Sequence, residues 1–441
     1  MRSRFSLPLL LLSLLLSTTT FQAQEKLAKA DKLEALSRQA VSSDQKKAAS
    51  AIAELRSLGP AGLRAMFTTH ANAINQQIVD PLTSSTPEWE RLSAALDVIA
   101  QQRNSYLSGL YWYTDFGDAK SAAKRSGKPI LSLRMLGKLN EEFSCANSRF
   151  FRTILYSNSA ISKKLREDFI LHWKSVRPVP HVTIDFGDGR KLERTLTGNS
   201  IHYVLDGDGR LIEALPGLYG PNAFLRVLLT SEQVFAKLHD AKNTNPASGL
   251  LSYRRDRVNR INANWLMDIE KTGGKAPEEL TVFRRPDGTV EAIAISALTM
   301  VKRMSEDTLL RGLSAGGESL GKVTDEATWK KIAQLHLRDA ELDSRSIGLI
   351  QRETRKVLGQ NDLASLLQKL QFNVAMDSVR NEYLMRTKLY VWLLQDRGQS
   401  DLETFNEKVY SELFLTPASD PWLGLFTADT YMALDDAGVV R

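Results

Sequence analysis

Residues 126–157 have the sequence SGKPILSLRMLGKLNEEFSCANSRFFRTILYS, which contains the only cysteine of the chain, Cys145. The apolar run from Ile130 to Leu136 predicts a short buried strand, and the polar residues after it predict a loop. After the cysteine, apolar residues recur at helical spacing, so Cys145 should lie at or just before the start of a helix. The positive end of that helix, with Arg149 and Arg152 nearby, should favour the thiolate form of Cys145.

The composition is that of a globular protein. The chain has 441 residues, of which 43% are hydrophobic and 25% are charged, and this length predicts about three domains. The net charge of +7 is small for the length, and basic residues are interspersed with acidic ones throughout. We therefore expect no nucleic-acid-binding surface.

Residues 1–23 have the pattern of a secretory signal peptide. Arg2 and Arg4 precede an apolar core from Phe5 to Ser17, and the small residue Ala23 marks the expected cleavage site. The core is too short to span a bilayer, and no later stretch reaches the necessary length, so we expect no membrane span after signal removal. The sequence therefore predicts an exported protein, periplasmic or secreted, in an oxidising compartment.

The oxidising compartment makes the lone cysteine informative. Cys145 has no second cysteine in the chain with which to form a structural disulfide. It can be a free thiol, a partner in a bond to another molecule, or an inert buried side chain.

The regions on either side of the cysteine segment have helical periodicity. This periodicity predicts a helical region over residues 24–110. Residues 241–250 are rich in Asn, Pro, Ser and Gly and predict a linker. Residues 251–441 predict a mostly helical domain with one hairpin near residues 281–293. Its tail from Pro417 onward should wrap a groove of that domain.

Between these regions, residues 111–240 show alternating strand and helix patterns. A strand is predicted from Phe169 to Trp173, and a helix from Ala223 to about Leu238. Two hairpins are predicted between them, around the Gly-Asp-Gly turn at residues 187–189 and the Asp-Gly-Asp-Gly turn at residues 206–209. Neither run has the ligand spacing of a calcium loop, so we interpret both as turns.

A resemblance to a known family appears in this middle region. The order strand, loop, CANS at residues 145–148, helix, and SNSAI at residues 157–161 resembles that of exported thioredoxin-like proteins. In that family the helix opens with Cys-x-x-Cys, and a Ser-Asp-Pro-Glu-Val segment follows. The resemblance covers residues 111–229. It implies an α/β thioredoxin-like domain, a central mixed sheet with flanking helices, between the helical regions.

The resemblance also implies roles for individual residues. Cys145 falls on the attacking cysteine and Ser148 on the resolving one, so these two are the catalytic candidates. Ser148 can donate a hydrogen bond to the thiolate, but it cannot form a disulfide. Asn199 and Ser200 stand where the family has a cis-proline loop that docks the substrate, and a cis bond before a residue other than proline costs about 3 kcal/mol. With His202 in the same strand, they are the candidate substrate-binding residues.

His202 has two interpretations: a base for Cys145, or a histidine packed under a helix. The strand before the cysteine lacks the buried acid that the family uses in proton transfer. A metal site would need more ligands than Cys145 and His202 supply, with His172 and His181 at unknown distance. We therefore expect no metal and no other cofactor.

Two functions are consistent with these observations. In the first, the protein is a single-thiol oxidoreductase or isomerase. Its Cys145 then forms mixed disulfides with protein thiol or disulfide clients, or reacts with an external small thiol, because Ser148 cannot complete an oxidation alone. In the second, a degenerate thioredoxin-like unit serves as a non-catalytic scaffold, a protein partner binds through the helical regions, and Cys145 is a buried relic.

Overall fold

The computed structural model describes residues 28–196, 198–240, 245–274, 282–284, 290–292, 320, 324–355, 357, 359–396, 400–423, 433 and 436. The chain forms two compact units, Met1–Tyr111 and Trp112–Arg441, and each is described by itself. The expected signal peptide lies outside the described residues. Within the ranges above, no helix combines the length and the apolar character that a membrane crossing requires.

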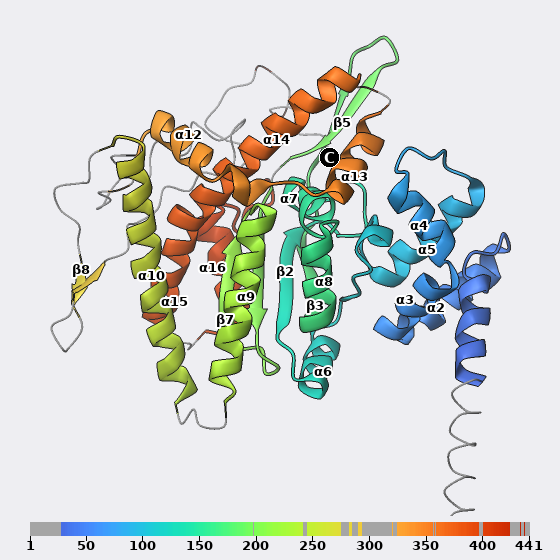
Figure 1. The fold of residues 1–441 in the computed structure, drawn as a ribbon, viewed down its shortest axis with the longest axis horizontal. Coiled ribbons are helices and arrows are strands. Elements are labelled where there is room, and N and C mark those ends of the chain that lie inside the picture. The colour runs from blue at the N-terminus through green and yellow to red at the C-terminus, as the bar shows by residue number, and fades with distance from the viewer. Residues whose placement is uncertain are drawn as a thin grey trace, which may run out of the picture. The chain divides into compact units, whose positions relative to one another are not determined.

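The first unit consists of short helices, as the periodicity predicts (Figure 1). Its last long helix ends at Ala100. The Asp97 carboxylate accepts hydrogen bonds from the N–H groups of Asn104 and Ser105, at 3.1 and 2.9 Å, and so folds the chain back. The helices are residues 28–39, α2 (Gln45–Ser57), α3 (Pro60–Thr69), α4 (Ala71–Val79), α5 (Pro87–Ala100) and the 3₁₀ turn η1 (Ser105–Leu107).

The second unit is built on a five-stranded mixed sheet. Its strands, in spatial order, are β1 (Trp112–Tyr113), β3 (Ile170–Arg177), β2 (Ile130–Leu136), β6 (Ser200–Leu205) and β7 (Leu211–Pro216). The first three are mutually parallel, whereas β6 is antiparallel to β2 and β7 is antiparallel to β6. Every residue of the central strand β2 is buried, which explains why its sequence is an apolar run.

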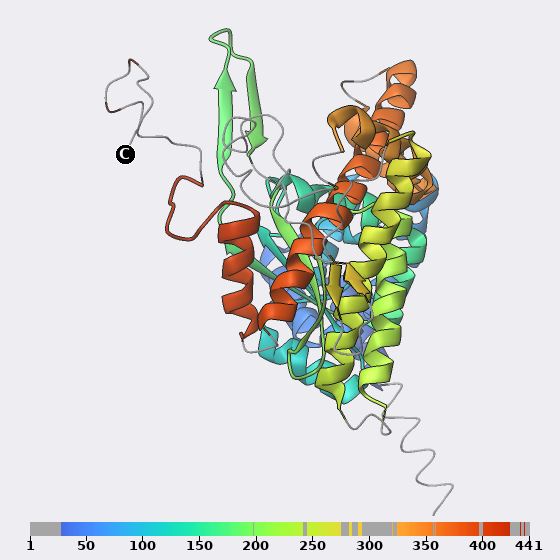
Figure 2. The same cartoon turned by 90° about the vertical axis from the view of Figure 1, so that its left-hand side faces the viewer.

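Both hairpins predicted around Asp-Gly turns are confirmed. One of them, β6–β7, belongs to the main sheet. The other consists of β4 (His181–Asp185) and β5 (Lys191–Thr195), a separate two-stranded ribbon that extends away from the main sheet (Figure 2). Ile184 and the turn residue Phe186 are 45% and 54% exposed on this ribbon.

Helices cover both faces of the sheet. On one face, the His202 ring contacts Phe151 and Phe224, with ring centroids 4.6 and 5.1 Å apart. On the other face, the Tyr203 hydroxyl donates a hydrogen bond to Asn406, in the C-terminal region, at 3.1 Å. The helices nearest the sheet in sequence are α6 (Phe116–Ser126), α7 (Ala146–Phe150), the π-helical turn η2 (Phe151–Leu155), α8 (Ser159–Asp168) and α9 (Pro221–Leu238).

The region beyond the sheet is mostly helical, as predicted, and belongs to the same compact unit. Its first helix begins at Pro246, within the segment expected as a linker, and residues 241–244 lie outside the described ones. The antiparallel pair β8 (Val282–Arg284) and β9 (Val290–Ala292) confirms the third hairpin. The helical elements are α10 (Pro246–Lys271), α12 (Glu326–Leu335), η4 (Leu337–Ala340), α13 (Ser344–Thr354), α14 (Gln360–Arg380), η5 (Asn381–Arg386), α15 (Thr387–Asp396), α16 (Leu402–Lys408) and η6 (Val409–Leu413).

Candidate functional site

Cys145 is the N-cap residue of α7, as the sequence predicts. Its N–H donates a hydrogen bond to the carbonyl oxygen of Leu136 at 3.2 Å, which ties it to the end of β2. Gly137 makes the turn out of β2 with a φ of 72°, and a Cβ there would lie 3.3 Å from the Cα of Ser144. A residue with a side chain would be strained in this conformation, so the turn requires glycine.

The Cys145 side chain is completely buried, with 0% exposure. Its Sγ lies 3.9 Å from the backbone oxygen of Asn199. Burial raises the pKa of the Cys145 thiol, and the hydrogen bonds from Ser148 oppose this rise without reversing it. The expectation of a stabilised thiolate is therefore wrong, because the cost of desolvating the charged sulfur exceeds the stabilisation at the helix terminus.

The two arginines near the thiol have different roles. The charge of Arg149 lowers the thiol pKa, but by less than burial raises it. Arg152 instead holds the loop between β2 and α7. Its guanidinium donates hydrogen bonds to the carbonyl oxygens of Leu139, Glu141 and Glu142, at 3.2, 2.6 and 3.3 Å.

The structure brings Ser148, Asn199 and Ser200 together around Cys145, and all three are 0% exposed. The Ser148 hydroxyl donates to the carbonyl oxygen of Cys145 at 2.9 Å. The Ser200 hydroxyl accepts a hydrogen bond from the side-chain amide of Asn147 at 3.0 Å. The bond before Ser200 is trans, since the described backbone contains no cis peptide bond. These polar groups thus tie α7 to the start of β6.

His202 lies in a buried cluster of aromatic side chains. Its Nε2 is 2.7 Å from the Tyr156 hydroxyl oxygen, and the rings of Phe151 and Phe224 pack against it. Burial lowers the pKa of His202 to about 3, so the ring is neutral at physiological pH. This environment agrees with the second interpretation of His202, a histidine packed under a helix, and not with a base for Cys145.

The C-terminal part of the chain closes the remaining side of the cysteine site. The Asn199 amide donates to Thr416 Oγ1 at 3.1 Å, and the Tyr410 hydroxyl donates to the Asn199 carbonyl oxygen at 3.4 Å. Arg177, at the end of β3, donates to the carbonyl oxygens of Thr416 and Pro417. The described start of the tail therefore lies against the sheet, and most of the tail falls outside the described residues.

The other candidate metal ligands have separate environments. His172 Nδ1 is 2.8 Å from Ser132 Oγ, and burial, with the charge of Arg134, lowers its pKa to about 3. His181 packs against Phe143, with ring centroids 5.4 Å apart. In the described part of the chain, no three His, Cys, Asp or Glu side chains gather closely enough to hold a metal ion.

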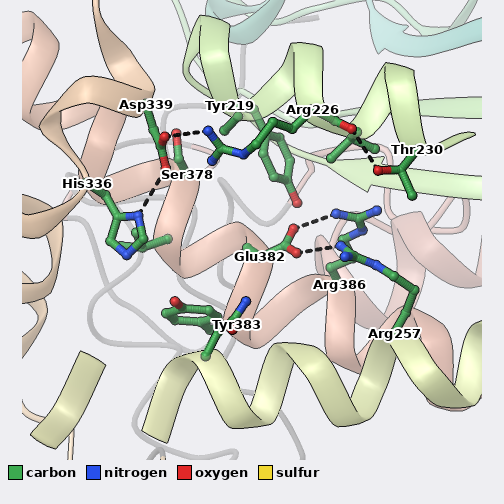
Figure 3. A pocket seen from close by; sticks show the side chains of 14 residues that line it. Tyr219, Arg226, Thr230, Arg257, His336, Asp339, Ser378, Glu382, Tyr383 and Arg386 are labelled. Atoms are coloured by element: carbon green, nitrogen blue, oxygen red, sulfur yellow. Dashed lines mark hydrogen bonds and ion pairs between the residues drawn. The ribbon is translucent and has the colours of Figure 1, made fainter. Parts of the chain in front are cut away.

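A second cluster of charged side chains, which the sequence analysis missed, lines a cavity of about 210 Å³ (Figure 3). Glu382 accepts hydrogen bonds from Arg257 at 2.8 Å and from Arg386 at 2.6 Å. Arg386 also pairs with Glu213 at 2.8 Å, and these two side chains are 1% and 0% exposed. Burial alone would raise the pKa of Glu213, but the charge of Arg386 holds it below the ordinary value.

Asp339 builds the opposite side of the cavity. It pairs with Arg226 of α9 at 2.7 Å and with His336 at 3.0 Å. His336 also bonds Asp268 at 2.6 Å, and the hydrogen bonds to these two carboxylates raise the pKa of His336 to about 9. Gly220 lets η4 approach the start of α9, because a Cβ there would lie 2.3 Å from the Asp339 carbonyl oxygen.

One signal in the sequence pointed to this cavity. Glu382 and Arg386 stand four residues apart in a helical segment and flank the apolar run Tyr383-Leu384-Met385. Opposite charges at this spacing next to buried residues indicate a polar group inside the core. Arg226, Arg257 and His336 gave no comparable signal, because each lies on a different segment.

Comparisons of the chain with protein-family models, with characterised proteins and with solved structures give no match. The mixed sheet with flanking helices is an α/β architecture set among helical segments.

Proposed function

We propose that the protein is an exported, non-catalytic scaffold or interaction protein built on a degenerate thioredoxin-like unit. Two observations support the thioredoxin-like assignment: the central position of β2 in a mixed sheet, and Cys145 at the N-cap of the helix that follows it. The pattern of residues 1–23 supports export.

The complete burial of the Cys145 sulfur is the main support for this proposal. A thiol that attacks disulfides needs a populated thiolate and access for its partner. Cys145 is 0% exposed, and burial raises its pKa. The side next to it is occupied by Thr416 and Tyr410 of the same chain, which bond to Asn199. The sulfur then acts as a small buried side chain within a packed frame.

The β4–β5 ribbon is the surface that best suits a protein partner. A two-stranded ribbon is marginally stable alone in water, and its edges pair with no other strand that the structure describes. Exposed Ile184 and Phe186 supply apolar contact area near its tip. An extended segment of a partner protein can add to such an edge through main-chain hydrogen bonds.

The alternative is thiol–disulfide exchange or isomerisation through a mixed disulfide at Cys145, and its position at the N-cap of α7 favours this function. In that reaction the thiolate attacks a disulfide of a client or of a small external compound and releases one thiolate. The segment around Thr416 would have to leave the site before either partner could reach the sulfur.

Incubation of the full chain with excess cystamine at pH 8, followed by mass spectrometry, separates the two functions. The scaffold proposal predicts no adduct on the folded protein and one adduct per chain in urea. An adduct that forms as fast on the folded protein as in urea would establish the exchange function instead.

A photo-crosslinking amino acid at position 186 tests the binding surface. The control is the same amino acid at Val79, an apolar residue of the first unit that is 84% exposed. The proposal predicts a discrete protein adduct from position 186 and none from position 79. Equal adducts from both positions, or none from position 186, would contradict the role of the ribbon.

A further inference from the structure

The cavity between α9, α10, η4 and the α14–η5 junction is built for a ligand and plays no part in the function proposed above. It holds about 210 Å³, the liquid volume of about seven water molecules. This is room for a small organic molecule. Arg226, at its rim, is 60% exposed, so the cavity can be reached from solvent.

The hydroxyl of Tyr219 is the clearest sign of a missing partner. Tyr219 is 2% exposed, and its Oη has no hydrogen-bond partner in the described structure. Figure 3 shows this hydroxyl pointing into the space between Arg226 and Glu382. Burial raises the pKa of Tyr219, so the hydroxyl keeps its proton and remains a donor. A buried donor without a partner costs free energy, and a bound acceptor would relieve that cost.

The arginines of the lining also have donors with unused capacity. Arg226 makes one ion pair, through Nη1 to Asp339, and Arg257 makes one, through Nη2 to Glu382. The Nε atoms of Arg257 and Arg386 have no partner among the described residues. In contrast, both oxygens of Glu382 already accept hydrogen bonds from arginines. The arginines and Tyr219 therefore favour a ligand that brings acceptors.

The balance of charge indicates how negative this ligand is. Arg226, Arg257, Arg386 and His336 stand against four carboxylates: Asp339, Glu382, Glu213 and Asp268. Lys271 also pairs with Asp268, at 3.8 Å, so the positive groups exceed the carboxylates by one, and this balance suits a single negative charge better than a doubly charged phosphate group.

The apolar part of the cavity lining indicates the chemical character of the uncharged part of the ligand. Ala223 and Val227 of α9 and Val379 of α14 line the cavity beside the charged groups. They offer an apolar surface against which a short hydrocarbon chain can be buried. A ligand with a charged head and a short apolar body would satisfy both parts of the lining.

From these observations we infer that the cavity binds a small organic monocarboxylate. Its carboxylate would accept hydrogen bonds from Arg226, Arg257 and Tyr219, and its apolar body would lie against Ala223 and Val227. Guanidinium groups and a neutral phenol are well suited to a carboxylate, because each presents directed donors to its two oxygens.

Butyrate is the probe for this inference, and butyramide is its uncharged match. Saturation-transfer NMR and calorimetry on the full chain should detect butyrate with a Kd between about 0.1 and 10 mM, the range expected for so small a ligand. Butyramide should bind at least about tenfold more weakly, because it lacks the charge. Equal binding of the two probes, or no butyrate binding at these concentrations, would overturn the inference. So would inorganic phosphate that binds more tightly than butyrate.

Two variants locate the site. Tyr219→Phe removes only the unpartnered hydroxyl and should weaken butyrate binding several-fold without loss of folding. Arg226→Gln should weaken it about tenfold or more. The control is Arg190→Gln, which removes an exposed arginine that pairs with Asp188. Butyrate binding that is unchanged in both cavity variants, or equally weakened in Arg190→Gln, would place the ligand elsewhere and contradict the inference.

Discussion

The side-chain amide of Asn199 donates a hydrogen bond to Thr416 Oγ1 at 3.1 Å, although the two residues are 217 positions apart in the chain. The backbone oxygen of Asn199 also lies 3.9 Å from the Cys145 sulfur. One residue therefore contacts both the thiol and the segment that covers it. The inertness that we propose for the thiol requires this segment to stay in place.

Replacement of Thr416 by valine tests the closure directly. The hydroxyl of Thr416 is fully buried, and its loss leaves the Asn199 amide without an acceptor. We expect the free energy of unfolding to fall by about 1–2 kcal/mol. We also expect Cys145 to react faster with alkylating reagents, because the cover opens more often.

Urea unfolding and alkylation of Thr416→Val measure these two effects. The control is Thr354→Val, whose hydroxyl donates to Ile350 within α13, away from the cysteine. It should leave the alkylation rate unchanged. A Thr416→Val protein that keeps wild-type stability and thiol protection would show that this hydrogen bond does not hold the cover.

The ion pair between Arg134 and Glu403 fastens α16 to the centre of the sheet. Arg134 lies in β2 with 0% exposure, and its Nη2 is 2.7 Å from Glu403 Oε1, on a side chain that is 52% exposed. Glu403→Gln leaves a buried guanidinium without its counter-charge. Because Glu403 is half exposed, we expect a loss of about 2 kcal/mol, less than for a fully buried pair.

Chemical denaturation of single and double variants checks this prediction. The double variant Arg134→Met/Glu403→Gln should recover part of the loss, because it no longer buries an unpaired charge. Glu88→Gln breaks an exposed pair with Arg91 and should cost much less than Glu403→Gln. Equal effects of Glu403→Gln and Glu88→Gln would mean that α16 is not held by this pair.

His336 should make stability depend on pH. Its pKa is raised from 6.5 to about 9 by hydrogen bonds to Asp268 and Asp339. A group whose pKa is higher in the folded state stabilises it fully below the unfolded pKa, and that stabilisation is lost as pH rises through the folded pKa. We therefore expect the free energy of unfolding to fall by about 2–3 kcal/mol between pH 6.5 and 9.5.

Urea unfolding at several pH values compares the wild type with His336→Gln. The variant should be less stable at pH 6.5 and should lose most of the decline toward pH 9.5. His239→Gln, which changes an exposed histidine at the end of α9, should keep the decline. If His336→Gln and the wild type show the same slope, the raised pKa is wrong.

Local patterns in the sequence predicted much of the fold. The apolar run before Cys145 became β2, and the two Asp-Gly turns became the expected hairpins. The position of Cys145 at the start of a helix was also predicted. These features follow from residues that are neighbours in the chain, so periodicity and turn chemistry are sufficient to find them.

The chemistry of the site could not be predicted in the same way. Arg149 and Arg152 suggested a stabilised thiolate, but burial of Cys145 raises its pKa, and its neighbour Asn199 is bonded by Thr416 and Tyr410, which no local pattern connects to it. The sequence also could not predict the cavity of Figure 3, because its lining comes from separate helical segments: α9, α10, η4 and the α14–η5 junction. Both the cysteine site and the cavity are built by residues that are distant in sequence, so local sequence patterns do not reveal their chemistry.

The rate of Cys145 alkylation by iodoacetamide, measured against pH on folded and urea-unfolded protein, tests the central claim most directly. The closed site predicts a folded-state rate at least about 100-fold below the unfolded rate from pH 7 to 9, with no inflection of the folded-state rate below pH 8.5, the ordinary cysteine pKa. A folded-state rate close to the unfolded one, with an inflection well below pH 8.5, would contradict it and establish Cys145 as a reactive thiol.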